Sequence, residues 1–394
     1  MKRLAMFFVY FGTGIAMGCI PGSDGWHAPA VSTKDAPPPK SAVGNIGAPI
    51  ATLLPSDSTA RLGFGHTLAL DGDTLLVGTK WAEGGAYIFT RSGSGWAEQA
   101  KLVVDNSRCL LRKPALSSGL VAMIGRDSSV HVFAHDGRTW SEETVLKLPG
   151  MDPCSASVAV ALSNDLLVAS VHVTGFDPEI SFFRRTGNTW ELEQRLEMDR
   201  TGSIADIAMQ GELAILTGSH NGWFLQRSDG VWKLTTPFIR LRDAAADSLH
   251  PPALDGSSVV VGIPHSPIRE ERVLVFDRQS LASLGSVSSG VEPSPASFGS
   301  AVAVDGDTLV TGTPYGERPK QSFAYVYIRG GDGRFGDGLA LRRSELPPSA
   351  GTAVALSGGQ LFVGAPTGRN DEGTRTGAVY VLALDSVTGN AEVE

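Results

Sequence analysis

Short runs of apolar and β-branched residues, broken by Gly, Asp and Ser, recur along most of this chain. Residues 64–102 show the pattern most clearly and predict four strands in a meander. Asp71-Gly72 predicts a tight hairpin between the first two strands, because both central positions of such a turn tolerate positive φ. A meander of about forty residues cannot bury its own apolar face, so it predicts further copies of itself.

The copies are marked by the residue that ends each second strand. DTLLVG (73–78) recurs in variants, and the seven segments end at Gly78, Gly125, Ser170, Gly218, Gly262, Gly312 and Gly364. Steps of about 44 to 52 residues, with four short strands per unit, are typical of propeller blades. We therefore predict an all-β fold, a seven-bladed β-propeller of four-stranded antiparallel blades over residues 48–384. Two unrelated β-sandwiches, the alternative, would not explain one repeating template.

The two ends of this repeat array are incomplete in complementary ways. Residues 48–54, APIATLL, form an extra strand before the first unit, whereas the last unit stops after its third strand, AVYVLAL. We expect the N-terminal strand to close the last blade by supplying its outer strand, since closure removes exposed sheet edges. Residues 385–394 are predicted to form a polar C-terminal tail.

The N-terminus has the pattern of an export signal. Lys2 and Arg3 precede an apolar stretch of about fifteen residues, too short for a comfortable membrane span. Residues 1–18 are therefore expected to be a signal peptide. Residues 19–47, which include Pro37-Pro38-Pro39, are expected to form a Pro-rich flexible tether.

The end of this signal resembles the lipoprotein box of bacteria. Ala16-Met17-Gly18-Cys19 places small residues before a cysteine, although Ala16 stands where that family usually has Leu. The resemblance implies that Cys19 is lipidated, and Ile20 after it favours the outer membrane. The alternative is an ordinary secretory signal that is simply cleaved.

The net charge of the chain argues against some classes of binding partner. The chain has a net charge of −8, and the loss of Lys2 and Arg3 with the signal peptide would leave −8 − 2 = −10. An acidic chain without a basic cluster argues against nucleic acid and against docking on anionic lipid through a charged face. The membrane contact that we expect is therefore the lipid anchor alone.

The units resemble FG-GAP repeats, which occur in integrin α-chain propellers and in many bacterial surface proteins. Phe64-Gly65 and Phe298-Gly299 match the FG element, and Gly364-Ala365-Pro366 matches the GAP element. Integrin-type repeats carry an acidic calcium loop between their first and second strands. Here that connection has shrunk to hairpins such as Asp71-Gly72-Asp73, which are too short to wrap an ion with six to eight oxygen ligands. We expect no calcium and no other metal.

Motifs of known catalytic types are absent from the sequence: His-Glu-x-x-His, a phosphate-cradling Gly-Lys-Ser/Thr and Gly-x-Ser-x-Gly do not occur. We therefore predict no catalytic residue and no cofactor. His66 and His131 are expected to be structural histidines within strands. Cys109 and Cys154 lie one repeat apart and are a candidate disulfide between neighbouring blades, a pairing that the sequence leaves open.

Five aromatic residues follow the turn between third and fourth strands. Their equivalent placement favours packing within the ring over a platform for sugar stacking. These residues are Trp96, Trp140, Trp190, Trp232 and Phe335.

The second-to-third loops and the blade-to-blade connections share one face in such a meander. On that face the long loops are 263–271, 313–322 and 365–376, in adjacent blades. Their mixed polar surface suits protein or glycan contacts, and the alternative is solvated loops without a ligand. The candidate binding residues are Tyr315, Arg318, Lys320, Arg369, Asp371 and Arg375.

Together these features predict an exported, lipid-anchored propeller, expected to be monomeric, that binds or scaffolds a protein or glycan partner at the bacterial envelope. One alternative is a hydrolase or lyase that acts on polysaccharide, with a site at the mouth of the central channel. Another is a structural subunit of an envelope complex. Two carboxylates at glycosidase spacing in the channel would favour the enzyme.

Overall fold

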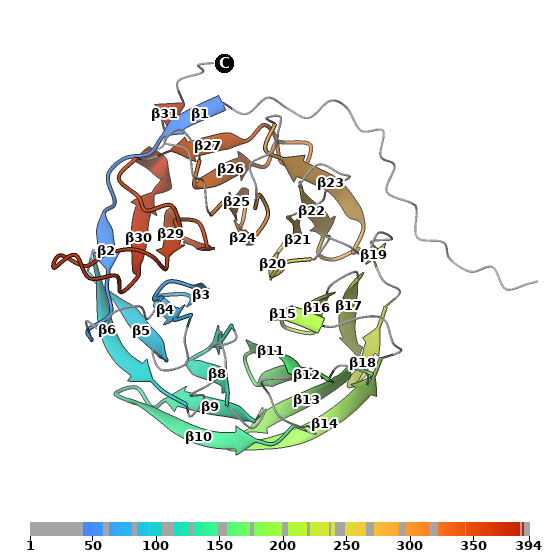
Figure 1. The fold of residues 1–394 in the computed structure, drawn as a ribbon. Helices are drawn as coiled ribbons and strands as arrows, with labels where there is room; N and C mark the ends of the chain where they lie inside the picture. The colour runs from blue at the N-terminus through green and yellow to red at the C-terminus, as the bar shows by residue number, and fades with distance from the viewer. Residues whose placement is uncertain are drawn as a thin grey trace, which may run out of the picture. The chain divides into compact units, whose positions relative to one another are not determined.

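Seven sheets of antiparallel strands stand around a central axis in the computed structural model (Figure 1). The structure describes residues 42–57, 63–80, 85–93, 95–104, 113–125, 129–148, 156–173, 177–198, 204–218, 221–235, 238–240, 249–264, 272–290, 297–314, 322–342, 344–386 and 388–389. This arrangement confirms the predicted seven-bladed β-propeller.

In each blade the first strand lies nearest the axis and the later strands lie progressively outward (Figure 1). The first three blades contain β3 (Thr67–Asp71), β4 (Thr74–Gly78), β5 (Ala86–Ser92) and β6 (Gly95–Leu102); β7 (Ala115–Ser117), β8 (Leu120–Ile124), β9 (Val130–His135) and β10 (Trp140–Leu146); and β11 (Ala156–Ser163), β12 (Leu166–Val173), β13 (Glu179–Thr186) and β14 (Thr189–Glu197).

The remaining four blades follow the same order. They contain β15 (Ile204–Gln210), β16 (Leu213–Gly218), β17 (Asn221–Ser228) and β18 (Val231–Leu234), with β19 (Ile239–Arg240) also paired to β17; β20 (Ala253–Leu254), β21 (Ser258–Ile263), β22 (Arg272–Asp277) and β23 (Ser283–Ser288); β24 (Ala301–Asp305), β25 (Thr308–Gly312), β26 (Ala324–Ile328) and β27 (Leu339–Arg342); and β28 (Ala353–Ser357), β29 (Gln360–Ala365) and β30 (Ala378–Ala383). A short 3-10 helix, η2 (Leu384–Ser386), follows β30.

The second strands are the most deeply buried elements, because each is covered on both sides by neighbouring blades. Every residue of β8, β16 and β21 is buried. This is why the repeat appears in the sequence as a continuous apolar run rather than as an alternation. Outer strands such as β14 alternate and face solvent on one side.

The seventh blade takes its outer strand from the N-terminal side of the chain. β2 (Ala51–Leu53) pairs antiparallel with β30, with Thr52 opposite Tyr380. The backbone N–H of Ile50 donates to the carbonyl oxygen of Val381 at 2.8 Å. Leu53 is only 5% exposed and packs in the apolar cluster shared by blades seven and one. This is the position that the sequence assigns to residues 48–54.

Two further short strands lie outside the repeat. β1 (Ala42–Asn45) pairs parallel with β27 of blade six, and β31 (Thr388–Gly389) pairs antiparallel with β1. They fall within the segments 19–47 and 385–394, for which we expected a tether and a polar tail. The outer edge of β27 offers unpaired backbone groups, and pairing with β1 satisfies them. These two strands are therefore part of the propeller, in contrast to the expectation.

The FG and GAP elements meet at blade boundaries, where they bring backbone against backbone. Gly65 has φ +84°, and a Cβ on Gly364 of the preceding blade would overlap its carbonyl oxygen. Gly299, with φ +88°, lies against Gly262 in the same way. Phe64 is fully buried and meets Tyr87 edge to face at 5.3 Å. Side chains larger than hydrogen at these glycines would separate the two blades.

The five aromatics that follow the third strands lie at the boundary with the preceding blade, as predicted for packing residues. Trp232 is 1% exposed and stacks on Phe182 of blade three at 4.9 Å. Trp96 meets Phe362 of blade seven edge to face at 5.1 Å. Trp140, Trp190 and Phe335 pack against the clusters between blades one and two, two and three, and five and six.

Candidate functional site

The loop between β29 and β30 is the candidate binding loop that the structure describes in full. Arg369 and Arg375 form an isolated antiparallel bridge, and Arg369 Nη1 donates to the carbonyl oxygen of Gly373 at 2.5 Å. The side-chain oxygen of Asn370 accepts a hydrogen bond from the backbone N–H of Thr374 at 2.8 Å. In Figure 1 this loop is the dark red hairpin that extends from the seventh blade.

The base of this hairpin is fixed to the connection that enters blade seven. Thr367 donates its N–H to Ser349 Oγ at 3.0 Å, and the two hydroxyls lie 2.6 Å apart. Arg369, Asp371 and Arg375 are exposed on the hairpin. The loop therefore offers charged side chains on an ordered backbone, an arrangement that reduces the ordering cost of binding.

Several predicted site residues lie outside the described residues. They are Cys19, Cys109, Cys154, Tyr315, Arg318 and Lys320. In the part of the chain that is described, no group of three or more His, Cys, Asp and Glu side chains is arranged to hold a metal. No helix in those same residues is long and apolar enough to cross a membrane.

The carboxylates of the hairpins between first and second strands contact other side chains and backbone groups of the protein. Asp73 lies 3.0 Å from Arg91 Nε, and Asp71 accepts the N–H of Ser118 in blade two at 2.5 Å. Asp307 pairs with Arg329 at 3.3 Å. These carboxylates therefore point to different partners instead of converging on one point.

An arginine at the end of the third strand joins neighbouring blades, a feature that our sequence interpretation missed. The equivalent residues are Arg91, His135, Arg185, Arg227, Arg278, Arg329 and Leu384, and each donates its backbone N–H to the residue directly before the second strand of its own blade. The signal was available, because five of the seven third strands end in Arg at repeat spacing.

The arginine side chains reach the preceding blade. Arg185 binds Glu143 of blade two through two hydrogen bonds, Nε–Oε2 at 3.0 Å and Nη2–Oε1 at 2.5 Å. Arg227 Nη2 donates to Glu193 of blade three at 2.6 Å. Burial alone would raise the pKa of Glu143, but hydrogen bonds from Arg185 and from the Trp190 indole lower it below its usual value.

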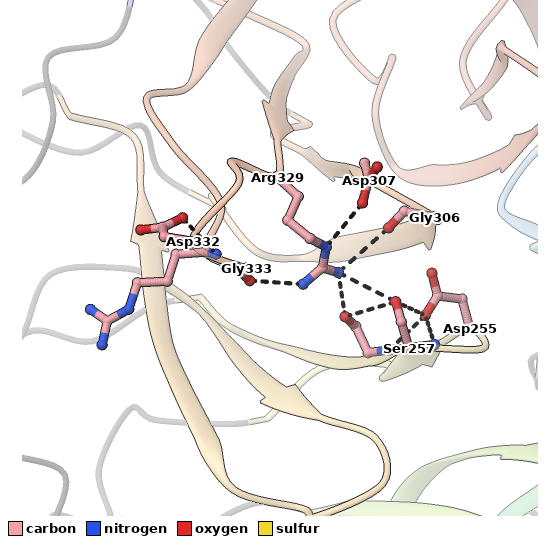
Figure 2. Close-up of polar contacts among 9 residues, drawn as sticks. Asp255, Ser257, Gly306, Asp307, Arg329, Asp332 and Gly333 are labelled. Carbon is pink, nitrogen blue, oxygen red and sulfur yellow. Dashed lines mark hydrogen bonds and ion pairs between the residues drawn. The ribbon is translucent and has the colours of Figure 1, made fainter.

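Figure 2 shows the equivalent arginine between blades five and six. Arg329 Nη2 donates to Ser258 Oγ at 2.5 Å, and Nη1 donates to the carbonyl oxygen of Gly333 at 3.0 Å. Its guanidinium also lies over the Phe335 ring at 4.3 Å. These contacts use the donors of Arg329 inside the protein, so this arginine stabilises the blade boundary and is not a site for an external ligand.

The segment after β2 is held to blade one by a second polar cluster. Lys101 Nζ donates to Asp57 at 2.5 Å, and the Tyr87 hydroxyl donates to the same carboxylate. Ser56 donates both its N–H and its hydroxyl to Glu98, at 2.9 and 2.7 Å. Burial and the hydrogen bond to Asp57 raise the pKa of Tyr87, so this hydroxyl stays protonated.

A cavity of about 420 Å³ lies at the centre of the ring. Each blade contributes to its lining, mostly with residues at or near the start of the innermost strand: Thr67, Lys113, Val160, Asp206, His250, Ser300 and Thr352. Pro314, which follows β25, also lines it. The cavity therefore lies toward the face of the blade connections, the face that carries the 365–376 hairpin.

The ionisable groups of this cavity come from four different blades. Burial lowers the pKa of Lys113, while the charge of Asp206 acts in the opposite direction. Burial, with a contribution from the charge of Lys80, lowers the pKa of His66, which favours the neutral imidazole. Asp206 is the one carboxylate of the described lining, so the described residues do not form the carboxylate pair of a glycosidase.

The two histidines singled out from the sequence differ in their placement. His131 lies in β9 as predicted, with Nδ1 2.9 Å from Glu142 Oε2. His66 lies before β3 rather than in a strand, because the turn at Gly65 delays the start of that strand. The backbone N–H of His66 donates to the carbonyl oxygen of Gly78 at 3.1 Å.

Comparison with known families supports the resemblance found in the sequence. A model of the FG-GAP repeat matches residues 49–93. This segment contains β2, β3, β4 and β5, that is, the outer strand of blade seven followed by three strands of blade one. The repeat in the sequence is thus offset by one strand from the blade, and this offset closes the ring. A β-propeller with an FG-GAP repeat at residues 49–93 favours a binding or scaffolding module.

Solved structures share the fold at low sequence identity. The Neurospora crassa Pan2 WD40 domain has a TM-score of 0.57 and 12% identity, over 90% of this chain and 100% of that one. A chain from a crystal structure of the mitotic checkpoint complex has a TM-score of 0.53 and 9% identity, over 85% of this chain and 94% of that one. These similarities concern the fold alone. No curated protein sequence matches this chain.

Proposed function

We propose that this chain is an exported, lipid-anchored β-propeller that binds or scaffolds a protein or glycan partner at the bacterial envelope. The observation that carries the binding role is the 365–376 hairpin. It holds four exposed charged side chains, those of Arg369, Asp371, Glu372 and Arg375, on a backbone fixed by hydrogen bonds within the hairpin and to Ser349. A rigid loop on a rigid ring can bind without a large ordering cost.

The location rests on the sequence of the N-terminus. Lys2 and Arg3, the apolar stretch and the small residues before Cys19 support export and lipidation. The prolines between Cys19 and the propeller support a tether that would hold the ring away from the membrane. The absence of a basic cluster from the sequence makes nucleic acid a poor partner.

Metabolic labelling with a clickable fatty acid tests the anchor. We expect the wild-type protein to incorporate the label and to fractionate with the outer membrane. Cys19→Ala is expected to lose the label, while Cys109→Ala, which leaves Cys19 intact, should keep it. Equal labelling of wild type and Cys19→Ala, or none in either, would refute lipidation at this residue.

A further inference from the structure

The arginine at the end of the third strand of blade five lacks the carboxylate partner that its equivalents have. Four of these equivalents each form an ion pair with an aspartate or glutamate: Arg91, Arg185, Arg227 and Arg329. Among the described residues Arg278 forms no ion pair, and its side chain makes one hydrogen bond, from Nη2 to the carbonyl oxygen of Gln210 at 2.9 Å.

The first of two repeat positions that place a carboxylate near these arginines is not acidic in blade five. It lies directly before the second strand, where four other blades hold Asp73, Asp165, Glu212 and Asp307. Blade five holds Ser257 there, and its hydroxyl lies 3.1 Å from Asp255 Oδ1 and 3.5 Å from Arg329 Nη2 (Figure 2). This side chain therefore contacts blade six rather than Arg278.

The second position lies in the preceding blade, three residues after its conserved place for tryptophan. It is Glu143 after Trp140 and Glu193 after Trp190, and these glutamates bind the arginines of blades three and four. In blade four the residue three places after Trp232 is Thr235, which carries no charge. The sequence thus removes both carboxylates from the surroundings of Arg278.

Arg278 lines a pocket between blades four and five, on the face of the first-to-second hairpins. The pocket has a volume of about 420 Å³, within the range of about 300–1,000 Å³ that is typical of small-molecule sites. The Nε and Nη1 atoms of Arg278 make no hydrogen bond to the described residues, and both are accessible to solvent. A molecule in this pocket can therefore reach unused donors of the guanidinium.

The charges of the lining favour an anion with a single negative charge. Arg227 also lines the pocket, but it binds Glu193 at 2.6 Å and Glu212 at 3.0 Å, which leaves Arg278 as the unpaired cation. Because Glu212 is itself part of the lining, a dianion would meet stronger repulsion than a monoanion. The side chains of Gln226 and Gln279 add amide donors and acceptors beside the guanidinium.

We propose that the Arg278 pocket binds the carboxylate of a small organic acid. The N–H groups of Arg278 that Gln210 leaves unused donate to the carboxylate, the pairing for which a planar guanidinium is suited. The amides of Gln226 and Gln279 bind polar groups on the rest of the molecule, so a hydroxy acid or a sugar acid fits this lining. The site lies on the face opposite the 365–376 hairpin and does not depend on the proposed function.

Isothermal titration of the full chain with acetate, lactate and glucuronate tests this site, with glucose as the uncharged counterpart of glucuronate. We expect at least one of the three acids to bind and glucose not to bind. Arg278→Gln should weaken the Kd of that acid at least about tenfold. Arg278→Lys keeps the charge without the planar fork and should also weaken it.

Arg334→Gln is the matched control, because Arg334 is an exposed arginine on the same face that does not line the pocket. Its Kd should equal that of wild type, and thermal melting should show all three variants folded. If none of the acids binds, or if glucose binds as tightly as glucuronate, the proposal is wrong. Equal weakening by Arg334→Gln and Arg278→Gln would show attraction by net charge alone, and tighter binding of inorganic phosphate than of every acid would overturn the assignment to a carboxylate.

Discussion

At the scale of single residues, an arginine at the end of the third strand joins five of the seven blades to the blade before them. Arg185 places a planar guanidinium against the Glu143 carboxylate, and both are mostly buried, with side chains 21% and 10% exposed. Glu143 also accepts the Trp190 indole N–H at 2.9 Å. Truncating this carboxylate would leave two buried donors without a partner, which costs more than the net value of the bond.

Glu143→Ala is therefore expected to lower the free energy of unfolding by about 2 kcal/mol. The neighbouring Glu142 is exposed and pairs with His131 among the described residues, so Glu142→Ala should change stability by less than about 0.5 kcal/mol. Urea unfolding of both variants gives the comparison. Equal stabilities would show that the arginine contact does not hold the blades together.

The same contacts predict how stability depends on pH. The pKa values of Asp57, Glu143 and Glu193 are lowered because, against the effect of burial, each accepts hydrogen bonds from Lys or Arg. A lowered folded-state pKa gives stability that is present above the unfolded value, about 4.3 for Glu and 3.9 for Asp, and lost as pH falls through the folded value.

We therefore expect the free energy of unfolding to fall steeply below about pH 4.3. Glu143→Gln should make this fall less steep, because its side chain does not titrate. Unfolding in urea at a series of pH values between neutral and acidic measures both slopes. Parallel pH profiles for variant and wild type would contradict the assignment of Glu143.

At the scale of elements, the sequence predicted the strands that are buried and missed those that pair through backbone alone. Second strands such as β4 are covered on both faces and must be apolar, so their repeat is visible. β1 and β31 have four and two residues and pair at an edge, which leaves no side-chain pattern. The lining of the cavity was also beyond prediction, since its residues come from seven blades and share no residue type.

The closing strand β2 makes a test at this scale. Leu53 is 5% exposed and Ile50 is 53% exposed, so the two side chains of one strand region differ in burial alone. Leu53→Ala should cost about 2–4 kcal/mol and lower the melting temperature, while Ile50→Ala should change stability by less than about 0.5 kcal/mol. If both variants melt with the wild type, β2 does not close the ring.

At the scale of the whole molecule, the two faces of the ring have different chemistry. The face of the first-to-second hairpins carries Arg185, Arg227 and Arg329, whose donors bind neighbouring blades. The opposite face carries the cavity and the 365–376 hairpin, and on the hairpin Arg369, Asp371 and Arg375 are exposed. A partner is therefore expected on the face of the blade connections.

Retention of the purified protein on isolated bacterial envelopes tests this account most directly. The wild type should be compared with a variant that combines Arg369→Ala, Asp371→Ala and Arg375→Ala. The control is Asp332→Ala/Arg334→Ala, which removes two exposed charges on the face of the first-to-second hairpins. We predict at least a roughly tenfold loss of binding for the hairpin variant and none for the control, since a few residues carry most of the binding energy at most interfaces. Equal retention of all three proteins would contradict a binding role for this face.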